Sequence, residues 1–229
     1  EIISADSMQI YEKMNIATAK PTDDEMQGIH HYLIGFQPID RKFSVAEYVT
    51  LAKECIEIIH NQGALPVVAG GTGLYIESLI NGIKFADQPD NTQIKAQLQQ
   101  ELAENGKEYM YNILMTIDPE YAQTVHMNNT VRVLRGIEVY RLTGHNMTWQ
   151  LANSRPQEKP YDVLLIGLTH SDRQKLYDNI NLRVDIMMSE GLLDEARYVY
   201  ENKESFKTCV SAIGYKEFFP FFDDEATVE

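Results

Sequence analysis

The chain has 229 residues, of which 44% are hydrophobic and 24% charged, an ordinary composition for one globular domain with room for a small insert. The net charge of −14 argues against a general nucleic-acid-binding surface, which is usually basic, but allows a local basic stripe. No apolar run approaches the ~20 residues of a membrane helix. The two cysteines, Cys55 and Cys209, lack disulfide or metal spacing, so we expect a reducing cytoplasm and no membrane.

Strands and helices are predicted to alternate along the first third of the chain. Short apolar runs at 1–5 and 65–69 predict strands, and a helix is predicted to begin near 22–25. Ser44 and Glu47 have capping-box spacing and precede a run with helical periodicity that ends at Gln62–Gly63. A further helix is predicted at 74–80. This alternation indicates an α/β fold with a parallel sheet flanked by helices.

The middle of the chain predicts helices only. Polar or amphipathic helical patterns cover 92–104, begin at 118–120 and cover 128–142, and 154–160 is typical of a linker. We therefore expect a helical insert at 87–160 between two parts of the α/β core, 1–86 and 161–229.

The α/β pattern returns after this insert. The apolar run at 161–168 predicts a buried parallel strand. A helix should follow from Ser171 to about Ser189, with Gly191 ending it.

Two groups of polar residues follow the first two predicted strands. Asp6 follows one strand, and Gly70-Gly71-Thr72-Gly73 follows the other. Because parallel strands end at the same edge of a sheet, both groups should face one cleft. Asp6 is either a general base or metal partner, or an aspartate that caps a turn. The glycines either hold an anion with backbone N–H groups or form a tight turn; they are not a P-loop, because no Lys follows.

Arginines are the remaining candidates. Arg132 and Arg135 share one helix face and either grip phosphates or pair with Glu138 on a solvated face. Arg183 lies near an apolar stripe and either reaches a cleft or extends to solvent. His30 and His31 are predicted in a loop with no partner at ligand spacing, so we assign no metal-binding residues.

Several motifs occur together in this chain: IISADSMQIY (2–11), TAKPT (18–22), SVAEY (44–48), GGTGLY (70–75), RVLRGIEV (132–139) with TG (143–144), and AIGYKE (212–217). In kind and order they resemble the tRNA dimethylallyltransferase (tRNA isopentenyltransferase) family. The resemblance implies transfer of a dimethylallyl group from dimethylallyl diphosphate to N6 of an adenosine beside the anticodon, at position 37. Diphosphate leaves, and Mg²⁺ assists.

The resemblance also implies a fold and residue roles. The fold is P-loop NTPase-like, with a helical insert that grips the tRNA anticodon stem-loop. Asp6 corresponds to the general base, and Arg183 to an arginine that holds the diphosphate. The expected diphosphate-binding residues are Lys20, Gly70, Gly71, Thr72, Gly73 and Arg183. The expected tRNA-binding residues are Asp6, Ser7, Met8, Gln9, Thr72, Lys95, Val131, Arg132, Val133, Leu134 and Arg135.

The family's P-loop and its basic carboxyl-terminal tail are expected outside residues 1–229, and these residues alone should be inactive. We expect a monomer. Alternatives are an adenylate isopentenyltransferase that acts on free nucleotide, a P-loop nucleotide kinase, and a non-catalytic tRNA-binding fragment.

Overall fold

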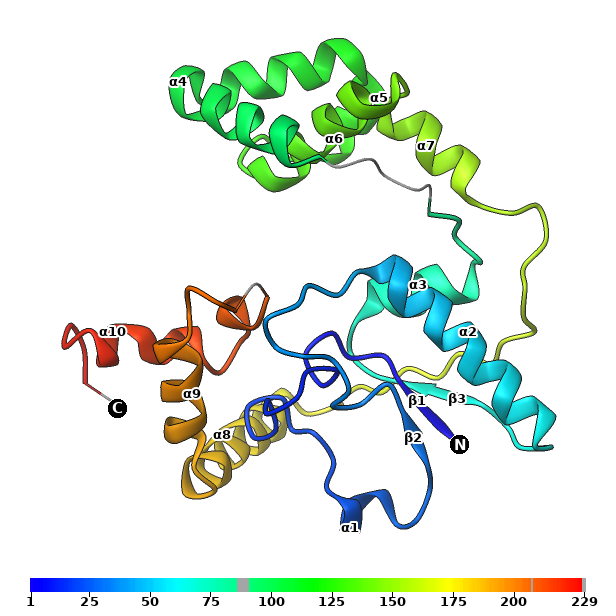
Figure 1. Ribbon diagram of the computed structural model, residues 1–229, viewed down its shortest axis with the longest axis vertical. Helices are drawn as coiled ribbons and strands as arrows, with labels where there is room; N and C mark the ends of the chain where they lie inside the picture. The colour runs from blue at the N-terminus through cyan, green and yellow to red at the C-terminus, as the bar shows by residue number, and fades with distance from the viewer. Residues whose placement is uncertain (86–90, 207, 228–229) are drawn as a thin grey trace. The chain divides into compact units, whose positions relative to one another are not determined.

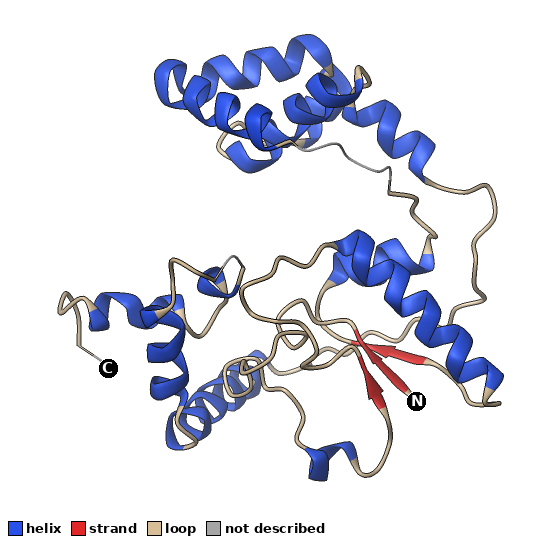
Figure 2. Ribbon diagram, viewed as in Figure 1, coloured by secondary structure: helices blue, strands red, loops and turns tan. Residues whose placement is uncertain are grey.

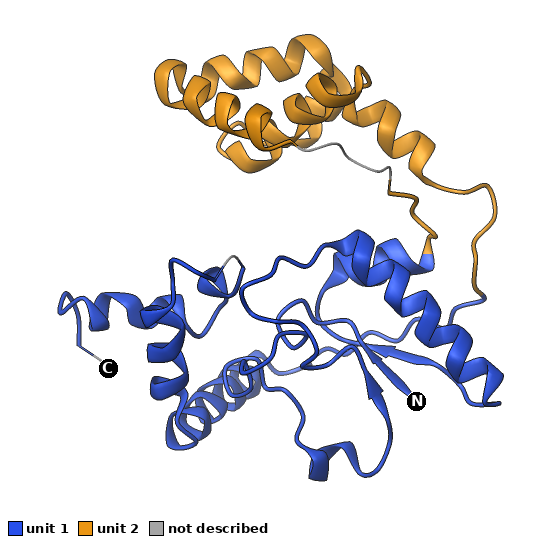
Figure 3. Ribbon diagram, in the orientation of Figure 1, with its two compact units in different colours: residues 1–80, 162–229 blue, residues 81–161 orange. Residues whose placement is uncertain are grey.

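The computed structural model describes residues 1–85, 91–206 and 208–227. It contains two compact units, Glu1–Ile80 with Asp162–Glu229, and Asn81–Tyr161 (Figure 3). The first expected boundary, between 86 and 87, lies outside the described residues. The second expected boundary, between 160 and 161, lies one residue before the boundary between the two units at Tyr161 and Asp162.

The first unit is built on a parallel sheet of three short strands (Figure 2). The strand order is β2-β1-β3, with β1 at Ile2–Ser4, β2 at His31–Tyr32 and β3 at Val67–Ala69. β1 pairs in parallel with both neighbours, so the predicted parallel sheet is confirmed. The prediction of a loop at His31 is wrong: two residues are too few to give a recognisable pattern, and only the pairing with β1 makes them a strand.

The helices of this unit are labelled in Figure 1, and α2 begins and ends close to its local signals. Ser44 and Glu47 form the predicted capping box, and the helix that they open buries Cys55. Tyr48 of this helix stacks on Tyr75 with ring centroids 4.2 Å apart. The helical elements are α1 Asp23–Met26, α2 Val45–Asn61, α3 Gly73–Ile80, α8 Arg173–Ser189, α9 Leu192–Glu201, η1 Cys209–Ser211, η2 Lys216–Phe218 and α10 Phe219–Phe222.

The loop that follows β1 is packed into a core cluster with the last part of the chain. Ile10, Tyr11 and Met14 are buried together with Val199 of α9 and with Tyr215. Each buried side chain of this size contributes roughly 1.5–3 kcal/mol to the stability of the folded state. This cluster therefore anchors the segment between β1 and Lys20 to α9.

The predicted strand at 161–168 is wrong for the described structure. The run is not part of the sheet, and Leu164 and Leu168 are 86% and 96% exposed. A strand forms only where a neighbouring strand pairs with it, and among the described residues β3 pairs with β1 alone. The predicted helix after it is present as α8, and its apolar residues Ile180, Leu182 and Val184 are exposed.

Every helix or strand in the described part of the second unit is a helix. Its elements are α4 Thr92–Ile117, α5 Pro119–Thr124, α6 Thr130–Thr143 and α7 Met147–Ser154. α4 is kinked at Gly106, whose φ of 80° is unfavourable for other residues. α6 packs on α4 across Gly136, where a Cβ would lie 2.7 Å from the Leu114 side chain. Small size at Gly136 therefore sets how closely the two helices approach.

Within residues 1–85, 91–206 and 208–227, no helix combines the length and apolar character needed to cross a bilayer.

Candidate active site

Asp6 lies just beyond β1 and organises the turn that follows. Its Oδ1 atom accepts hydrogen bonds from the backbone N–H groups of Met8 at 2.8 Å and Gln9 at 3.1 Å. Among the described residues, no group hydrogen-bonds to the second carboxylate oxygen. Asp6 thus caps a turn with one oxygen and leaves the other for a ligand, so the two interpretations of its sequence position are compatible.

The glycine-rich turn directly contacts the Asp6 turn. The backbone N–H of Ser7 donates to Thr72 Oγ1 at 2.9 Å, and the Thr72 N–H donates to the Ala5 carbonyl at 3.0 Å. The Ala5 N–H in turn donates to the Ala69 carbonyl at 2.7 Å. These bonds join the ends of β1 and β3, as expected for neighbouring parallel strands.

The three glycines of this turn do not all have the same surroundings. A Cβ on Gly70 would lie 2.4 Å from the backbone of Ala5, so Gly70 is required by the close approach of β1 rather than by a ligand. Gly71 and Gly73 have open space where a Cβ would lie. Their backbone at the start of α3 can approach a ligand closely, as the sequence predicts for an anion site.

Tyr75, in the first turn of α3, lies close enough to Asp6 for that side chain to affect its pKa. Burial, followed by the nearby Tyr11 and Asp6 side chains, raises the pKa of Tyr75 to about 12. Tyr75 therefore stays protonated at neutral pH.

Gln9 and Lys20 connect the turn to the loop that follows. Gln9 Nε2 donates to the carbonyls of Thr18 and Ala19, both at 3.1 Å. Lys20 Nζ donates to the Tyr11 carbonyl at 2.6 Å, and desolvation lowers the pKa of this lysine. Met8 packs against the core cluster beside α9. The predicted contacts of these side chains with tRNA or diphosphate stay predictions.

Sequence analysis did not identify Glu195 of α9, which accepts hydrogen bonds from three consecutive backbone N–H groups in this loop. Its only sequence signal is an acidic residue in the first turn of a helix, which is common and nonspecific.

Arg183 is exposed in the middle of α8. No residue in the described part of the chain forms a hydrogen bond or ion pair with its side chain. Its predicted role with diphosphate therefore stays a prediction.

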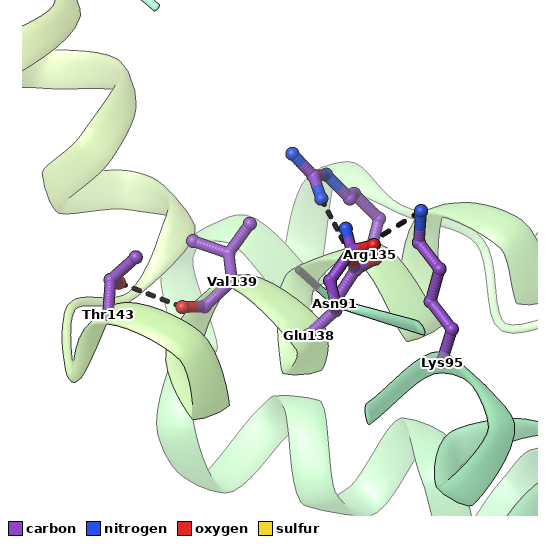
Figure 4. A network of polar contacts seen from close by, with 6 residues as sticks. All are labelled: Asn91, Lys95, Arg135, Glu138, Val139 and Thr143. Carbon is purple, nitrogen blue, oxygen red and sulfur yellow. Dashed lines mark hydrogen bonds and ion pairs between the residues drawn. The ribbon is translucent and has the colours of Figure 1, made fainter. Parts of the chain in front are cut away.

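The helical unit holds a separate group of charges around Glu138 (Figure 4). The Glu138 side chain is only 6% exposed, and its Oε1 lies 3.0 Å from Arg135, 2.6 Å from Asn91 and 3.9 Å from Lys95. Arg135 does pair with Glu138, one of the two interpretations of the sequence. Because the Arg135 and Lys95 side chains are 38% and 54% exposed, both cations remain accessible to an anionic partner.

The segment 131–135 at the start of α6 divides between surface and core. Val131 is 78% exposed and Arg132 is exposed. Val133 and Leu134 are 1% and 7% exposed and pack inside the helical unit. The expectation that these two side chains contact tRNA does not fit their burial, because helical periodicity turns them toward α4.

No group of three or more His, Cys, Asp or Glu residues that could hold a metal ion occurs within the described ranges. Near Asp6 the chain offers one carboxylate oxygen and the hydroxyls of Ser7 and Thr72, which are 3.3 Å apart. Mg²⁺ is commonly held by one or two carboxylates together with substrate phosphates and water. This donor set fits a magnesium ion that arrives with a diphosphate, but not a cage built by protein alone.

The chain is similar to known proteins along its length. A family model described as IPP transferase matches residues 9–229. The tRNA dimethylallyltransferases of Bacillus mycoides (strain KBAB4) and Bacillus cereus (strain AH187) are 43% and 44% identical to the chain over 229 residues, all of this chain and 72% of each relative.

Solved structures give the same result. The full-length tRNA isopentenylpyrophosphate transferase of Bacillus halodurans is similar with a TM-score of 0.67 and 39% identity, over all of this chain and 70% of that one. A eukaryotic dimethylallyltransferase, described as acting on tRNA, is similar with a TM-score of 0.78 and 28% identity, over 98% of this chain and 57% of that one. The chain therefore belongs to the IPP transferase family.

Proposed function

We propose that the chain transfers a dimethylallyl group from dimethylallyl diphosphate to N6 of the adenosine at tRNA position 37, beside the anticodon. A bond forms between N6 and the allylic carbon, and the bond from that carbon to the diphosphate oxygen breaks. Asp6 takes a proton from the amino group, and diphosphate leaves as an anion. The relatives' names support this reaction and favour neither a kinase nor an enzyme that modifies free nucleotides.

The junction of Asp6 and Thr72 is the observation that carries the proposal. The 2.9 Å bond from Ser7 to Thr72 holds a carboxylate beside a glycine-rich helix start. An adenine amino group is a weak nucleophile, so a positioned base helps its attack by a typical factor of about 10²–10⁴. Backbone N–H groups near that base suit the charge that builds on the leaving diphosphate.

Diphosphate would be held by the backbone of Gly71 and Gly73 together with the side chains of Lys20 and Arg183. The uncovered backbone at both glycines supports this placement. The hydroxyls of Ser7 and Thr72 would hold a Mg²⁺ ion together with the diphosphate, and the ion would supply neutralisation of phosphate charge.

The helical unit would bind the anticodon stem-loop through the exposed cations of Lys95, Arg132 and Arg135. Such contacts with phosphates position RNA without reading its sequence. The target adenine has to leave the anticodon stack to reach Asp6, as bases do for other enzymes that modify them. We further propose that the protein acts as a monomer in the cytoplasm, where tRNA is available.

An assay with three acceptors tests this function. The full-length protein is incubated with dimethylallyl diphosphate, Mg²⁺ and either an anticodon stem-loop with adenosine at position 37, the same RNA with guanosine there, or adenosine monophosphate. Mass spectrometry should find the dimethylallyl group on the first RNA alone. Transfer to the free nucleotide but not to RNA would contradict the proposal, as would phosphate transfer from ATP without prenyl transfer.

A further inference from the structure

The Glu195 carboxylate binds the loop after β1 at several points. Its Oε2 accepts from the Asn15 N–H at 2.9 Å, and its Oε1 accepts from the N–H groups of Ile16 and Ala17 at 3.0 Å each. The Tyr215 hydroxyl donates to Oε1 at 2.6 Å. One side chain on α9 thus serves three consecutive backbone donors and a phenol.

Among the described residues, the N–H groups of residues 15–17 have no backbone acceptor, so the Glu195 carboxylate satisfies them. Residues 15–17 lie outside the helices and strands, so their N–H groups depend on a side-chain acceptor. Hydrogen bonds to an ionised carboxylate are about twice as strong as neutral ones. Burial, and then the bond to Glu195, raise the pKa of Tyr215, so its hydroxyl remains a donor.

The same loop continues directly to the candidate active site. The carbonyls of Thr18 and Ala19 accept from the Gln9 side chain at 3.1 Å each, and the Gln9 N–H donates to Asp6 Oδ1 at 3.1 Å. Lys20 follows Ala19 in the chain. A continuous series of hydrogen bonds and backbone therefore links Glu195 to both Asp6 and Lys20.

Packing reinforces this link from the Tyr215 side. Gly214 has a φ of +92°, and a Cβ on it would lie 2.9 Å from the Ala17 Cβ. The turn that carries Tyr215 thus lies directly against the segment that Glu195 holds. Tyr215 itself is fully buried beside Ile10 and Met14 of the loop.

We propose that Glu195 is a positioning residue for the transfer reaction, which acts through residues 15–19 and Gln9 to fix Asp6 and Lys20, with Tyr215 holding its carboxylate in place. This inference rests on the proposed function, since it assumes that Asp6 and Lys20 act on the acceptor and the donor.

Glu195→Gln is the direct test, because it keeps the size of the side chain but replaces one acceptor oxygen with an NH₂ group. Whichever way the amide turns, that group faces backbone donors, so at least one N–H loses its partner. A displacement of Asp6 by about 1 Å costs up to 10²-fold in rate. We expect kcat to fall 10- to 100-fold, while affinity for the anticodon stem-loop stays unchanged because the helical unit is separate.

The pH profile supplies a readout that a purely structural role would not change. The charged groups that act on Lys20 are Glu195 of α9 and Glu12 of the loop, and both favour its protonated form. Removing the Glu195 charge should lower the pKa of Lys20 further. The alkaline decline of kcat/KM for dimethylallyl diphosphate should therefore move to lower pH in Glu195→Gln.

Glu201→Gln is the matched control, since Glu201 ends the same helix, is exposed, and has no hydrogen bond or ion pair with any described residue. Tyr215→Phe is the second variant: it keeps the carboxylate and the buried ring, and kcat should fall several-fold. All rates are measured per folded molecule, well below each variant's melting temperature.

Transfer by the unmodified protein separates the two proposals. If the unmodified full-length protein transfers no dimethylallyl group, the proposed function fails. If the unmodified protein does transfer the group, then the kcat values and pH profiles of Glu195→Gln and Tyr215→Phe decide. Values equal to those of the unmodified protein would refute the role of Glu195. If Glu195→Gln does not fold, Tyr215→Phe decides: an unchanged kcat rejects the positioning role.

Discussion

Gly70→Ala should disrupt the junction between β1 and the glycine-rich turn. The new Cβ would lie 2.4 Å from the carbonyl carbon and oxygen of Ala5, whereas ordinary contacts begin at 3.4 Å, so the backbone has to move by about 1 Å. Ala5 cannot yield freely, because its N–H and carbonyl are bonded to Ala69 and Thr72. Overpacking of this kind costs about 1–3 kcal/mol of folding free energy.

The same displacement should reach the chemistry, since Asp6 follows Ala5 directly. A misplacement of about 1 Å in a catalytic group lowers the rate by up to 10²-fold. We therefore expect Gly70→Ala to reduce both the urea midpoint of unfolding and the single-turnover rate of prenyl transfer.

Gly71→Ala is the matched control, because it makes the same chemical change one residue later, where a Cβ meets open space. Its free energy of unfolding should stay within about 0.5 kcal/mol of the unmodified protein, and any loss should appear as weaker donor affinity. If Gly70→Ala had an unchanged urea midpoint and rate, or if Gly71→Ala lost as much stability, the close approach of β1 would not be the constraint at Gly70.

Three further predictions concern charged side chains. Desolvation lowers the pKa of Lys20 from its ordinary value, so kcat/KM for the donor should decline at a lower pH than for an ordinary lysine. Lys20→Arg should move this decline to higher pH. An unmoved profile would exclude Lys20 from donor binding. Arg132→Ala should reduce the slope of log affinity for RNA against log salt by about 1. Arg141→Ala should leave that slope unchanged, because Glu101 engages the Arg141 guanidinium at 2.7 Å; equal slopes for both variants would remove Arg132 from the RNA surface. Arg183→Ala should raise the KM for dimethylallyl diphosphate at least tenfold, with the exposed Lys175→Ala on the same helix as control, and an unchanged KM would contradict its role.

Features with local causes were predictable from the sequence. The capping box of Ser44 and Glu47 depends on residues three positions apart, and α2 begins where they indicate. The contact between the Asp6 turn and Thr72 was predictable from one general rule, that parallel strands end at the same edge of a sheet.

Features that depend on distant partners were not predictable. The apolar run 161–168 has the composition of a buried strand, but pairing decides whether it becomes one, and composition does not reveal the neighbour. The Glu195 contacts join residues about 180 positions apart, and no local pattern distinguishes this glutamate from others on helix surfaces.

Burial within one motif differs from what the family resemblance implied, although helical periodicity accounts for it. Residues 131–135 were expected to bind tRNA as a block, yet Val133 and Leu134 belong to the core while Arg132 is exposed. A contiguous motif on a helix always presents more than one face, so only part of it reaches a ligand.

Asp6→Asn tests the central claim most directly, because the amide oxygen can still accept from the N–H groups of Met8 and Gln9 but cannot take a proton. The single-turnover rate of dimethylallyl transfer to an anticodon stem-loop should fall by about 10²–10⁴-fold, with RNA affinity unchanged. A rate near that of the unmodified protein would show that Asp6 is not the base.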